Sequence, residues 1–428
     1  MATRATAHVG PVVARYVVFA AVASILGACA RSGPSGGPSS PPPPVDARSV
    51  RVSLGAAASV ALSATDAWRL VDHDGRTVAR GDSGERVSFS SAPGGVRVAH
   101  RGVTDLTVTE LPLSVVPRGA AAFATFNGRR YRGQLSVAAA DTFLYVINRI
   151  DVESYLRGVV PREIGVRTAT ERAAVEAQAV AARSYVITRL GNSARPFDVS
   201  ATTADQVYGG VESENAIANA AIDATAGLVL YFGDRIVSGQ YYSTCGGTTA
   251  EPAELWRSRN EPYLQRVSDR IPGTDRYYCD IAPRFRWERS WRADSLAAVI
   301  ERYIRSYVDA PPEPLGAVRD VVVEGRTASG RVAVLRVDME HGAYRVRGND
   351  IRNVLRSAGG EPLNSTYFTP DIVTAADGRL SRLTVRGLGY GHGVGMCQWG
   401  AIGRARAGQD FRMILRTYYP GTRVARAY

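Results

Sequence analysis

The chain contains no lysine, and all 52 of its basic residues are arginine. Its 40 acidic residues leave a formal net charge of +12, a balance that can attract nucleic acid, anionic lipid or an acidic polymer. The arginines are scattered rather than clustered, and no zinc-finger or RNA-binding signature accompanies them. Because the chain is also rich in alanine, glycine and valine, we attribute its charge to a GC-rich coding bias and expect no nucleic-acid partner.

Histidine is scarce as well, and of the five histidines only His392 lies in a segment that looks specialised. The H-E-x-x-H zinc motif, the P-loop and the G-x-G-x-x-G dinucleotide fingerprint are all absent from the sequence. The one G-x-S-x-G match, at 33–37, lies in a Pro- and Gly-rich stretch and not at a strand-to-helix turn. These absences argue against metalloprotease, nucleotide-binding and serine-hydrolase chemistry.

Beyond the N-terminus no segment is apolar for the roughly 18 residues that a membrane span requires. The N-terminus itself has Arg4 and Arg15 before a short apolar run at 16–29, a pattern typical of an export signal. The run ends in Leu-Gly-Ala-Cys, which resembles a bacterial lipobox. We therefore expect a lipoprotein signal peptide at 1–28 and lipidation of Cys29, with a plain signal peptide and a chance cysteine as the alternative.

Residues 29–47 are rich in proline, serine and glycine and predict a tether with polyproline character. Signal, lipid anchor and tether together predict an exported, membrane-anchored protein of the cell envelope. In a Gram-negative cell, Ala30 after the cysteine instead of aspartate favours the periplasmic face of the outer membrane.

The folded part is predicted to be α+β. Alternating and β-branched segments separated by turn signals predict strands over 50–149, and we place a β-rich N-terminal region at 48–115 and a second domain at 116–428. Helices are predicted at 168–190, where Thr168 and Glu171 form a capping-box pattern, and at four other places. Those four are 212–227, 292–308, 349–359 and 396–408, and a hairpin is expected after the first of them.

A glycine-rich stretch, GLGYGHGVGMCQWG at 387–400, has glycine at five alternate positions. In an extended strand this pattern would leave one face bare, although each glycine costs roughly 0.5–1 kcal/mol relative to alanine. The bare face could pack against another backbone or form a floor for a sugar strand. The stretch is best interpreted as a strand-to-helix junction that brings His392 and Cys397 to a site.

Glu163 lies in the segment YLRGVVPREIG, between an apolar turn and the capped helix. A carboxyl group that is partly buried at such a junction would have a raised pKa and could act as a general acid. The alternative is a solvated loop glutamate, and composition alone favours that alternative.

Several motifs, in this order, resemble the SpoIID/LytB family: YLRGVVPREIG, ERAAVEAQAVAARSYV, DQVYGG, STCGG and GHGVGMCQWGA. The resemblance extends over roughly 48–422. It implies a peptidoglycan lytic transglycosylase that acts on glycan strands stripped of stem peptides, with Glu163 as the catalytic acid and Arg183 also required. Other members enhance a separate cell-wall amidase, so a non-catalytic glycan-binding partner of an amidase is the alternative.

A lytic transglycosylase needs one carboxyl group, where ordinary glycosidases use two. We expect Gln178 and Tyr208 to flank the developing positive charge, and Tyr390, His392 and Gln398 to contact the substrate. The planar guanidinium of Arg183 could bind the lactyl carboxylate of muramic acid. No cofactor is required for this reaction.

Besides Cys29 the chain has three cysteines, Cys245, Cys279 and Cys397. An exported protein often forms disulfides, and Cys245–Cys279 is one possibility. A structural zinc site of three thiolates with His392 or another group as fourth ligand is a second possibility, and free thiols are a third. Zinc-binding relatives have a histidine just before the S-T-x-G-G turn, where this chain has tyrosines.

Overall fold

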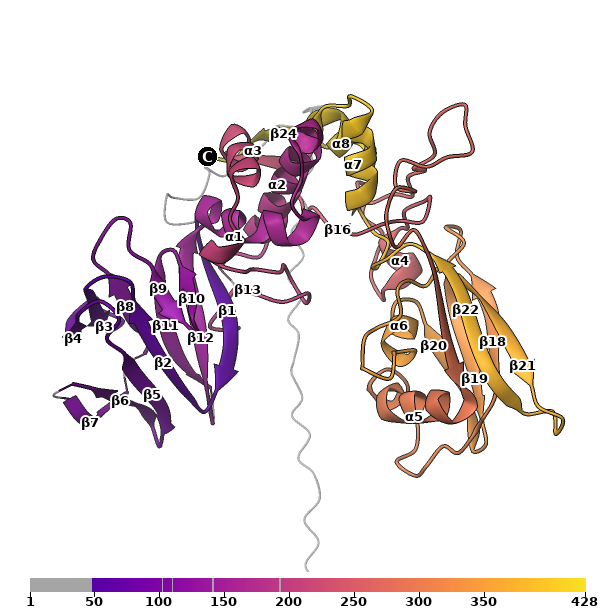
Figure 1. Cartoon of the computed structure of the whole chain (residues 1–428), viewed down its shortest axis with the longest axis horizontal. Helices are drawn as coiled ribbons and strands as arrows, with labels where there is room; N and C mark the ends of the chain where they lie inside the picture. Colours follow the sequence, from indigo (N-terminus) through magenta and orange to yellow (C-terminus); the bar gives the residue numbers. More distant parts are fainter. Residues whose placement is uncertain (1–47, 102, 110, 141, 192–193) are drawn as a thin grey trace, which may run out of the picture. The chain divides into compact units, whose positions relative to one another are not determined.

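The structure of the protein, a computed structural model, describes residues 48–101, 103–109, 111–140, 142–191 and 194–428. The predicted signal peptide, the tether and Cys29 lie outside these residues. The α+β class is confirmed, because strands and helices are both extensive and are largely segregated along the chain (Figure 1). Within the described ranges, no helix combines the length and the apolar character that crossing a membrane would need.

The N-terminal part consists of two sheets. The larger has the strand order β13-β1-β12-β11-β8-β3-β4 and the smaller the order β10-β9-β2-β5-β6-β7. Alternation of buried and exposed residues along these strands places one face of each in the core. The strands are β1 (Ser49–Ala57), β2 (Ser59–Ala64), β3 (Trp68–Val71), β4 (Thr77–Gly81), β5 (Val87–Ala92), β6 (Gly95–His100), β7 (Val103–Val108), β8 (Leu113–Pro117), β9 (Ala124–Phe126), β10 (Arg129–Tyr131), β11 (Gln134–Ala140), β12 (Phe143–Asp151) and β13 (Val199–Ser200).

The predicted boundary between residues 115 and 116 falls inside β8. The larger sheet also joins strands from both sides of that boundary, since β8 pairs with both β3 and β11. The β-rich N-terminal strands therefore share a sheet with β12, the strand that leads directly into the first helix.

Helix α2 (Arg172–Ile187) lies at the centre of a helical layer and contacts α1 (Val152–Ile164), α3 (Ala216–Ala224), α7 (Gln398–Arg406) and α8 (Phe411–Tyr418) (Figure 1). Its many buried alanines allow this close packing. The capping box is confirmed in the short 3₁₀ turn η2 (Ala169–Glu171) that precedes it, where the Thr168 N–H donates to Glu171 Oε2. A small sheet of β15 (Arg235–Ile236), β14 (Leu228–Phe232) and β24 (Arg423–Arg426) adjoins these helices.

Helix α1 was not predicted, although Asp151 caps it by accepting the Ser154 N–H at 2.9 Å. Pro161 lies within it, and proline in a sequence normally argues against helix interior. Glu163 is therefore in the last turn of a helix and not at a loop junction.

A long excursion separates two short strands that pair in parallel, β16 (Tyr241–Tyr242) and β23 (Met396–Cys397). Most of the excursion folds around a hydrophobic core of its own. We call residues 286–388 the inserted region. It comprises two three-stranded sheets and two α-helices: β17 (Arg286–Arg292), α5 (Ala293–Tyr303), β18 (Val318–Arg326), β19 (Val332–Met339), β20 (Gly342–Arg347), α6 (Asp350–Val354), β21 (Phe368–Thr374) and β22 (Leu380–Leu388).

Short turns of helix complete the description. They are η3 (Val211–Ser213), α4 (Pro252–Leu255) and η4 (Ile304–Ser306). The predicted helices at 212–227, 292–308, 349–359 and 396–408 thus correspond to α3, α5, α6 and α7, each shorter than expected.

The expected strand over the alternating glycines is wrong beyond Leu388, whereas the expected strand-to-helix junction is present where β23 leads directly into α7. Strand β22 ends at Leu388, and the next four alternate glycines all have φ between 78° and 114°, a region that favours glycine. The chain also passes very close to other backbone: a Cβ on Gly395 would lie 2.1 Å from the carbonyl oxygen of Gln240. The glycines therefore serve a tightly packed, turning loop between β22 and β23.

Candidate functional site

A cleft of about 750 Å³ contains Glu163. Its walls come from segments far apart in the sequence: the end of α1, the loop at 203–207, residues around β16, helix α6 of the inserted region, and the glycine-rich loop. Three of the predicted substrate-binding residues line it together with Glu163, namely Tyr390, His392 and Gln398. The fold thus brings together motifs that are more than 200 residues apart.

The Glu163 carboxyl group is held by one backbone donor. The Val207 N–H donates to its Oε1 at 2.7 Å, and the Gln398 side chain is a second hydrogen-bonding partner. Burial raises the pKa of Glu163 to about 7, and these hydrogen bonds and Arg162 oppose the rise only in part. A carboxyl group with this pKa is substantially protonated at neutral pH and can give up its proton.

Gln398 connects this carboxyl group to the helical core. Its Nε2 donates to Gln178 Oε1 at 3.2 Å, and Gln178 is fully buried beneath it. Gln178 therefore lies behind the cleft wall and positions Gln398, whereas we had expected it to flank the substrate directly.

His392 lies in the cleft wall, with Tyr242 and Trp256 beside its ring. Its Nε2 is 2.9 Å from the Tyr241 carbonyl oxygen, and its Nδ1 accepts the Val394 N–H at 3.1 Å. Burial and the nearby Arg352 lower the pKa of His392 to about 3, so the ring is neutral. Both ring nitrogens are engaged within the protein. His392 is therefore better suited to shaping the cleft wall than to donating a proton.

Arg183 and Tyr208 do not line the cleft. Arg183 is fully buried and donates to both carboxylate oxygens of Glu153, at 2.8 and 2.6 Å, and to the Leu228 carbonyl oxygen. Tyr208 is buried and donates to Asn148 Oδ1 at 2.8 Å. Because its donors are occupied in the core, Arg183 cannot bind a substrate carboxylate in this arrangement, and the expected direct contact is corrected to a structural one.

Sequence reasoning missed two polar groups of the cleft. Asp205 is fixed by the Tyr185 hydroxyl at 3.1 Å and by the Ser200 N–H at 2.9 Å. The Tyr241 hydroxyl accepts from Gln206 Nε2 at 2.9 Å, which leaves its own proton free for another acceptor. The motif D-Q-V-Y-G-G contains Asp205 and was the available signal for it.

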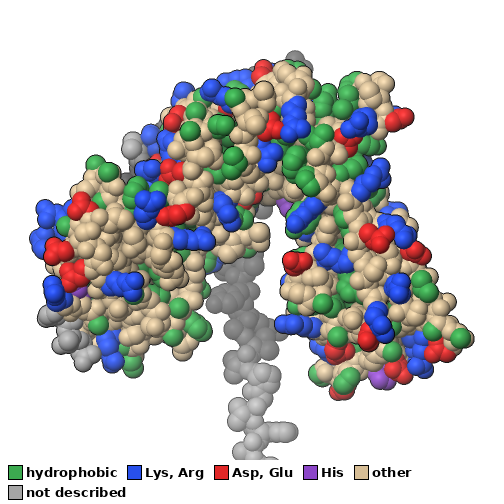
Figure 2. All heavy atoms as spheres, viewed as in Figure 1, with side chains coloured by type: hydrophobic (Ala, Val, Ile, Leu, Met, Phe, Trp, Pro, Cys, Tyr) green, Lys and Arg blue, Asp and Glu red, His purple; other side chains and the backbone are tan. Residues whose placement is uncertain are grey.

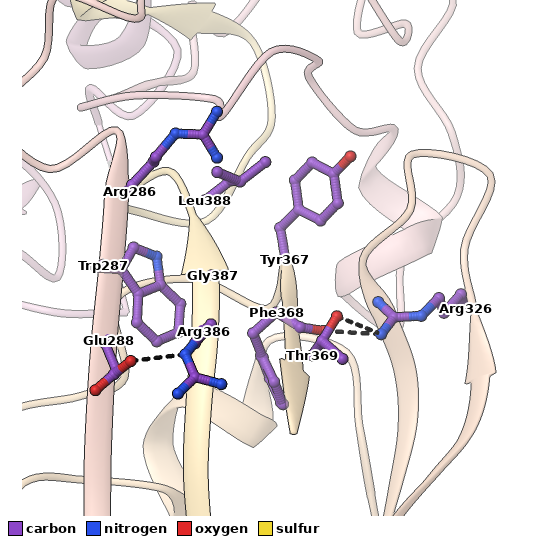
Figure 3. A pocket seen from close by; sticks show the side chains of 10 residues that line it. All are labelled: Arg286, Trp287, Glu288, Arg326, Tyr367, Phe368, Thr369, Arg386, Gly387 and Leu388. Atoms are coloured by element: carbon purple, nitrogen blue, oxygen red, sulfur yellow. Dashed lines mark hydrogen bonds and ion pairs between the residues drawn. The ribbon is translucent and has the colours of Figure 1, made fainter. Parts of the chain in front are cut away.

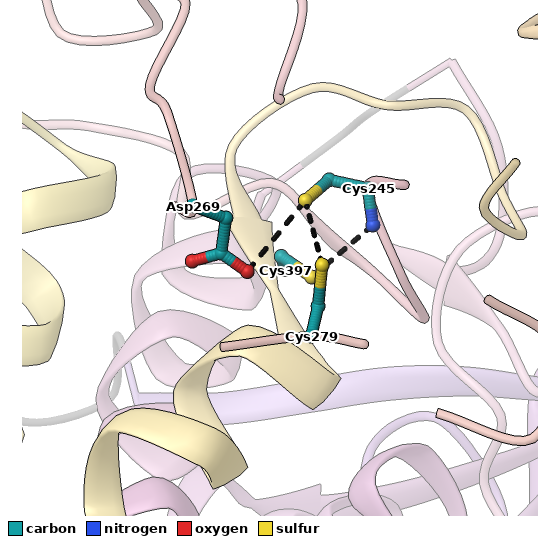
Figure 4. Close-up of side chains that lie close together, drawn as sticks. All are labelled: Cys245, Asp269, Cys279 and Cys397. Carbon is teal, nitrogen blue, oxygen red and sulfur yellow. Dashed lines mark hydrogen bonds between the residues drawn. The ribbon is translucent and has the colours of Figure 1, made fainter. Parts of the chain in front are cut away.

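The three cysteines of the folded part meet in one buried cluster with Asp269 (Figure 4). Their ligand atoms all lie within 4.8 Å of one another, and the Cys245 and Cys279 sulfurs are 3.3 Å apart as free thiols. His392 is not part of this cluster, so the expected fourth ligand is corrected: among the described residues, the group that completes the set is Asp269.

The surroundings of the cluster suit a metal ion. The Cys397 sulfur accepts two backbone N–H groups, from Cys245 and Gly400, both at 3.2 Å, and these bonds favour a thiolate. Asp269 Oδ1 accepts from Tyr418 at 2.7 Å and from Arg404 at 3.1 Å, which orients the carboxylate as outer-shell groups do in metal sites. Three sulfurs and one carboxylate are a donor set that zinc accepts.

A second pocket, of about 520 Å³, lies on the inserted region (Figure 3). The rings of Trp287, Tyr367 and Phe368 line it. Two of its three arginines are already engaged, since Arg386 donates to Glu288 at 2.7 Å and Arg326 to the Phe368 carbonyl oxygen at 2.9 Å. None of the predicted site residues lies here, and the pocket has no group with an obvious catalytic use.

Charged side chains of both signs are interspersed over the face seen in Figure 2. Many arginines form ion pairs with carboxylates, such as Arg132 with Glu214 at 2.7 Å and Arg51 with Asp198 at 2.6 Å. Such pairing neutralises part of the arginine charge locally.

Comparisons with known proteins identify the family of the chain. The family model described as Stage II sporulation protein matches residues 140–232, which include Glu163. An uncharacterized protein of Brachyspira hyodysenteriae is 30% identical over 299 residues, covering 69% of this chain and 73% of that protein. The chain belongs to the SpoIID/LytB family.

Two relatives within this SpoIID/LytB family have names that point to different roles. Stage II sporulation protein D of Bacillus subtilis is 27% identical over 66% of this chain and 76% of its own length. The amidase enhancer of the same organism is 32% identical over 62% of this chain, but the match spans only 40% of that longer protein. Residues 275–395, which include the inserted region, match a family model of a domain of unknown function.

Proposed function

We propose that this SpoIID/LytB protein is a peptidoglycan lytic transglycosylase in which Glu163 is both acid and base. The observation that supports this proposal most directly is the carboxyl group of Glu163, which lies in an open cleft and has a pKa of about 7. The names of the relatives add support for a role at the cell wall.

In the proposed reaction, protonated Glu163 gives its proton to the glycosidic oxygen, and the bond from that oxygen to the anomeric carbon breaks. Positive charge develops on the sugar ring. The Glu163 carboxylate then takes the proton of the muramic 6-hydroxyl, whose oxygen bonds to the anomeric carbon. The product is a 1,6-anhydro end, no water is consumed, and Glu163 returns to its protonated state.

Asp205 lines the same cleft, and Arg189 Nε lies 3.7 Å from its Oδ1. Its oxygens accept hydrogen bonds from Tyr185 and Ser200, so the carboxylate is held in place. In our proposal it stabilises the positive charge of the transition state electrostatically. A conventional glycosidase would instead use a second carboxylate to activate water or attack the sugar, and the product distinguishes the two reactions.

The test is incubation of purified protein with glycan strands freed of stem peptides, followed by mass spectrometry of the products. We expect 1,6-anhydromuramic ends with the wild type and none with Glu163→Gln. Reducing ends without the anhydro form would indicate a hydrolase. Retention on glycan without turnover would overturn the enzymatic proposal.

The second candidate function is that of a non-catalytic glycan-binding protein that modulates a cell-wall amidase. The similarity to the amidase enhancer favours it. We would measure amidase activity on whole peptidoglycan with and without this protein. Stimulation that survives in Glu163→Gln would support the accessory role, and stimulation that disappears with the catalytic carboxyl group would count against it.

We further propose that Cys245, Asp269, Cys279 and Cys397 bind a structural zinc ion. The ion would join the segments at 245–279 to the start of α7 and supply no step of the reaction. Metal analysis of protein purified without chelator, combined with thiol titration, tests this. One bound zinc and three thiols released by chelation are expected; a metal-free protein with one remaining thiol would indicate the Cys245–Cys279 disulfide instead.

We also propose that the protein is exported and lipid-anchored at Cys29. Such an anchor would hold it in the cell envelope, close to peptidoglycan. Globomycin-sensitive processing and metabolic labelling with a fatty acid would test the anchor. A Cys29→Ala variant that is still labelled would contradict it.

A further inference from the structure

Arg352 is the strongest unexplained group in the cleft. It belongs to α6 of the inserted region, whereas Glu163 belongs to α1, yet both line the same cavity. Its Nε donates to the Leu363 carbonyl oxygen at 2.8 Å and its Nη1 to Asn349 Oδ1 at 3.2 Å. These bonds hold the guanidinium plane in place and leave Nη2 available.

The charge of Arg352 has no counter-ion within the described part of the chain. Its recorded hydrogen bonds go to a carbonyl oxygen and an amide oxygen, and no carboxylate lies within ion-pair distance of it. Of the deeply buried arginines, Arg183 is paired with Glu153 and Arg404 with Asp269. Arg331 donates only to backbone carbonyl oxygens, as Arg352 does to Leu363, but Arg331 does not line the cleft. A mostly buried charge without a partner is costly to the fold, which suggests that its counter-ion is a ligand.

The neighbours of Arg352 make this part of the cleft more positive. Burial lowers its pKa to about 10, with Arg289 acting in the same direction and Tyr390 in the opposite one. The side chain therefore remains charged at neutral pH. His392 beside it is neutral, so Arg352 is the cation that a bound anion would meet on this wall.

We propose that Arg352 binds the lactyl carboxylate of a muramic acid residue and so selects glycan strands that have lost their stem peptides. This inference rests on the proposed function. In a strand that keeps its peptides the lactyl group is an amide, which has no charge and no second acceptor oxygen. A guanidinium discriminates between these two groups because it attracts the charged carboxylate electrostatically, whereas the neutral amide offers it only a hydrogen-bond acceptor.

The proposal also gives a role to a part of the chain whose family model has no assigned function. Helix α6 is anchored beside the cleft by the Asn349 N–H, which donates to the Leu255 carbonyl oxygen at 2.8 Å. The cleft is incomplete without this helix, since Asn349, Arg352 and Asn353 are all part of its lining. Substrate selection would thus reside in the inserted region and the acid–base chemistry in α1.

The test measures binding and does not need turnover. Denuded glycan oligosaccharides, the same oligosaccharides with lactyl carboxylates converted to amides, and peptide-bearing oligosaccharides are titrated against full-length protein carrying Glu163→Gln. We expect the denuded acid form to bind at least about 10-fold more tightly than the amide. Tight binding of the peptide-bearing form alone would assign the charge to a stem-peptide carboxylate and overturn the proposal.

Arg352→Gln should remove this preference and should weaken binding of the acid form much more than binding of the amide form. The matched control is Arg356→Gln, one turn further on, whose side chain donates to the Asn353 and Gly360 carbonyl oxygens and is not itself part of the cleft lining. It should keep the preference. Arg352→Lys should retain part of it, because the charge remains while the bonds from Nε and Nη1 that hold the guanidinium in place are lost.

A preference for the acid form that survives in Arg352→Gln would overturn the inference. Absence of anhydro products from the wild type, with an intact preference that depends on Arg352, would instead overturn the proposed reaction and leave the binding role standing. Thermal melting of each variant shows that the compared proteins are folded.

Discussion

At the scale of single residues, the cleft depends on a conflict between burial and charge at Glu163. The Val207 N–H and Gln398 favour the ionised carboxylate, while desolvation favours the neutral acid and prevails. The consequence is an acid that is strong enough to donate a proton at neutral pH and weak enough to hold one. The basic limb of the pH–rate profile should accordingly fall near pH 7.

The raised pKa of Glu163 also makes a prediction about stability. A raised folded-state pKa means that the folded protein binds this proton more tightly than the unfolded chain, so stability is lost as pH rises from about 4.5 to 7. Glu163→Gln removes this loss. We expect the variant to be more stable than the wild type at pH 8 by roughly 1–3 kcal/mol, measured by urea unfolding.

The same comparison at pH 4.5 is the internal control. There the Glu163 carboxyl group is protonated in the folded protein and the two proteins should differ much less. An equal difference at both pH values would show that the substitution acts through packing and not through the charge, and it would remove the support for a neutral carboxyl group in the cleft.

Asp205 gives a second prediction at this scale. Asp205→Asn keeps the shape and most hydrogen bonds of the side chain but removes its charge. If that charge stabilises the transition state, kcat on denuded glycan should fall about 10- to 1000-fold with little change in KM. The remaining product should still carry anhydro ends, because Glu163 is unaltered; a switch from anhydro to reducing ends, or unchanged kcat, would contradict this role.

Sequence patterns identified four residues of the cleft, since Glu163, Tyr390, His392 and Gln398 lie in long motifs. They placed Arg183 wrongly, because a sequence does not tell whether a guanidinium faces substrate or a buried partner such as Glu153. Asp205 and Arg352 were missed for a related reason. Each becomes a cleft residue only through tertiary packing that no local spacing encodes.

At the scale of elements, Arg183 holds α1, α2 and β14 together. Its guanidinium spans from Glu153 on α1 to the Leu228 carbonyl oxygen on β14, and Glu153 also accepts from the Gly227 N–H and the Tyr428 hydroxyl. The helix that carries Glu163 is thus fixed at its other end by this network. Arg183 is a positioning residue for the cleft.

We therefore predict that Arg183→Met destabilises the protein by about 2–4 kcal/mol, because it leaves a partly buried carboxylate unpaired. The matched control is Arg172→Met on the same helix, whose pair with Glu176 is exposed on the arginine side and should be worth about 0.5 kcal/mol. Chemical denaturation measures both. Undiminished stability of Arg183→Met with a selective loss of glycan affinity would restore Arg183 to the substrate site.

The glycine-rich loop permits a similar comparison. Gly395 and Gly408 have nearly equal φ values, 78° and 81°, but a Cβ at Gly395 would meet the Gln240 carbonyl oxygen, whereas nothing lies within 4 Å of one at Gly408. Gly408→Ala should cost about 1 kcal/mol for the backbone alone. Gly395→Ala should cost clearly more in the same unfolding assay; equal costs would refute the close approach.

Helix α2 was predictable because its capping box and apolar stripe are local signals. Helix α1 was not predictable, because Pro161 lies inside it and proline in a sequence normally argues against a helix interior. The alternating glycines resembled a strand because period two is the strand period. Their true cause is a set of positive φ angles in a turning loop, and composition alone does not distinguish the two.

At the scale of the whole molecule, β16 and β23 close a long excursion of the chain. Cys245 and Cys397 meet although they are 152 positions apart, and Asp269 and Cys279 join them from the segment before the inserted region. Because Gln398 follows Cys397 directly, the cluster lies one residue from a group that contacts Glu163. The three cysteines could be recognised in the sequence as candidate ligands. Asp269 could not, because no spacing rule links it to the cysteines.

If zinc occupies this cluster, its removal should affect both stability and the cleft. We expect a chelator to lower the melting temperature by about 5–15 °C and to weaken binding of denuded glycan, since the ion ties the start of α7 to the segments around Cys245. Asp269→Asn should lower zinc affinity in a competition titration with a chromophoric chelator. As a control, Asp275→Asn at an exposed position of the same segment should leave zinc affinity unchanged. If the chelator leaves the melting temperature unchanged, the buried thiols and carboxyl group hold these segments together without a metal.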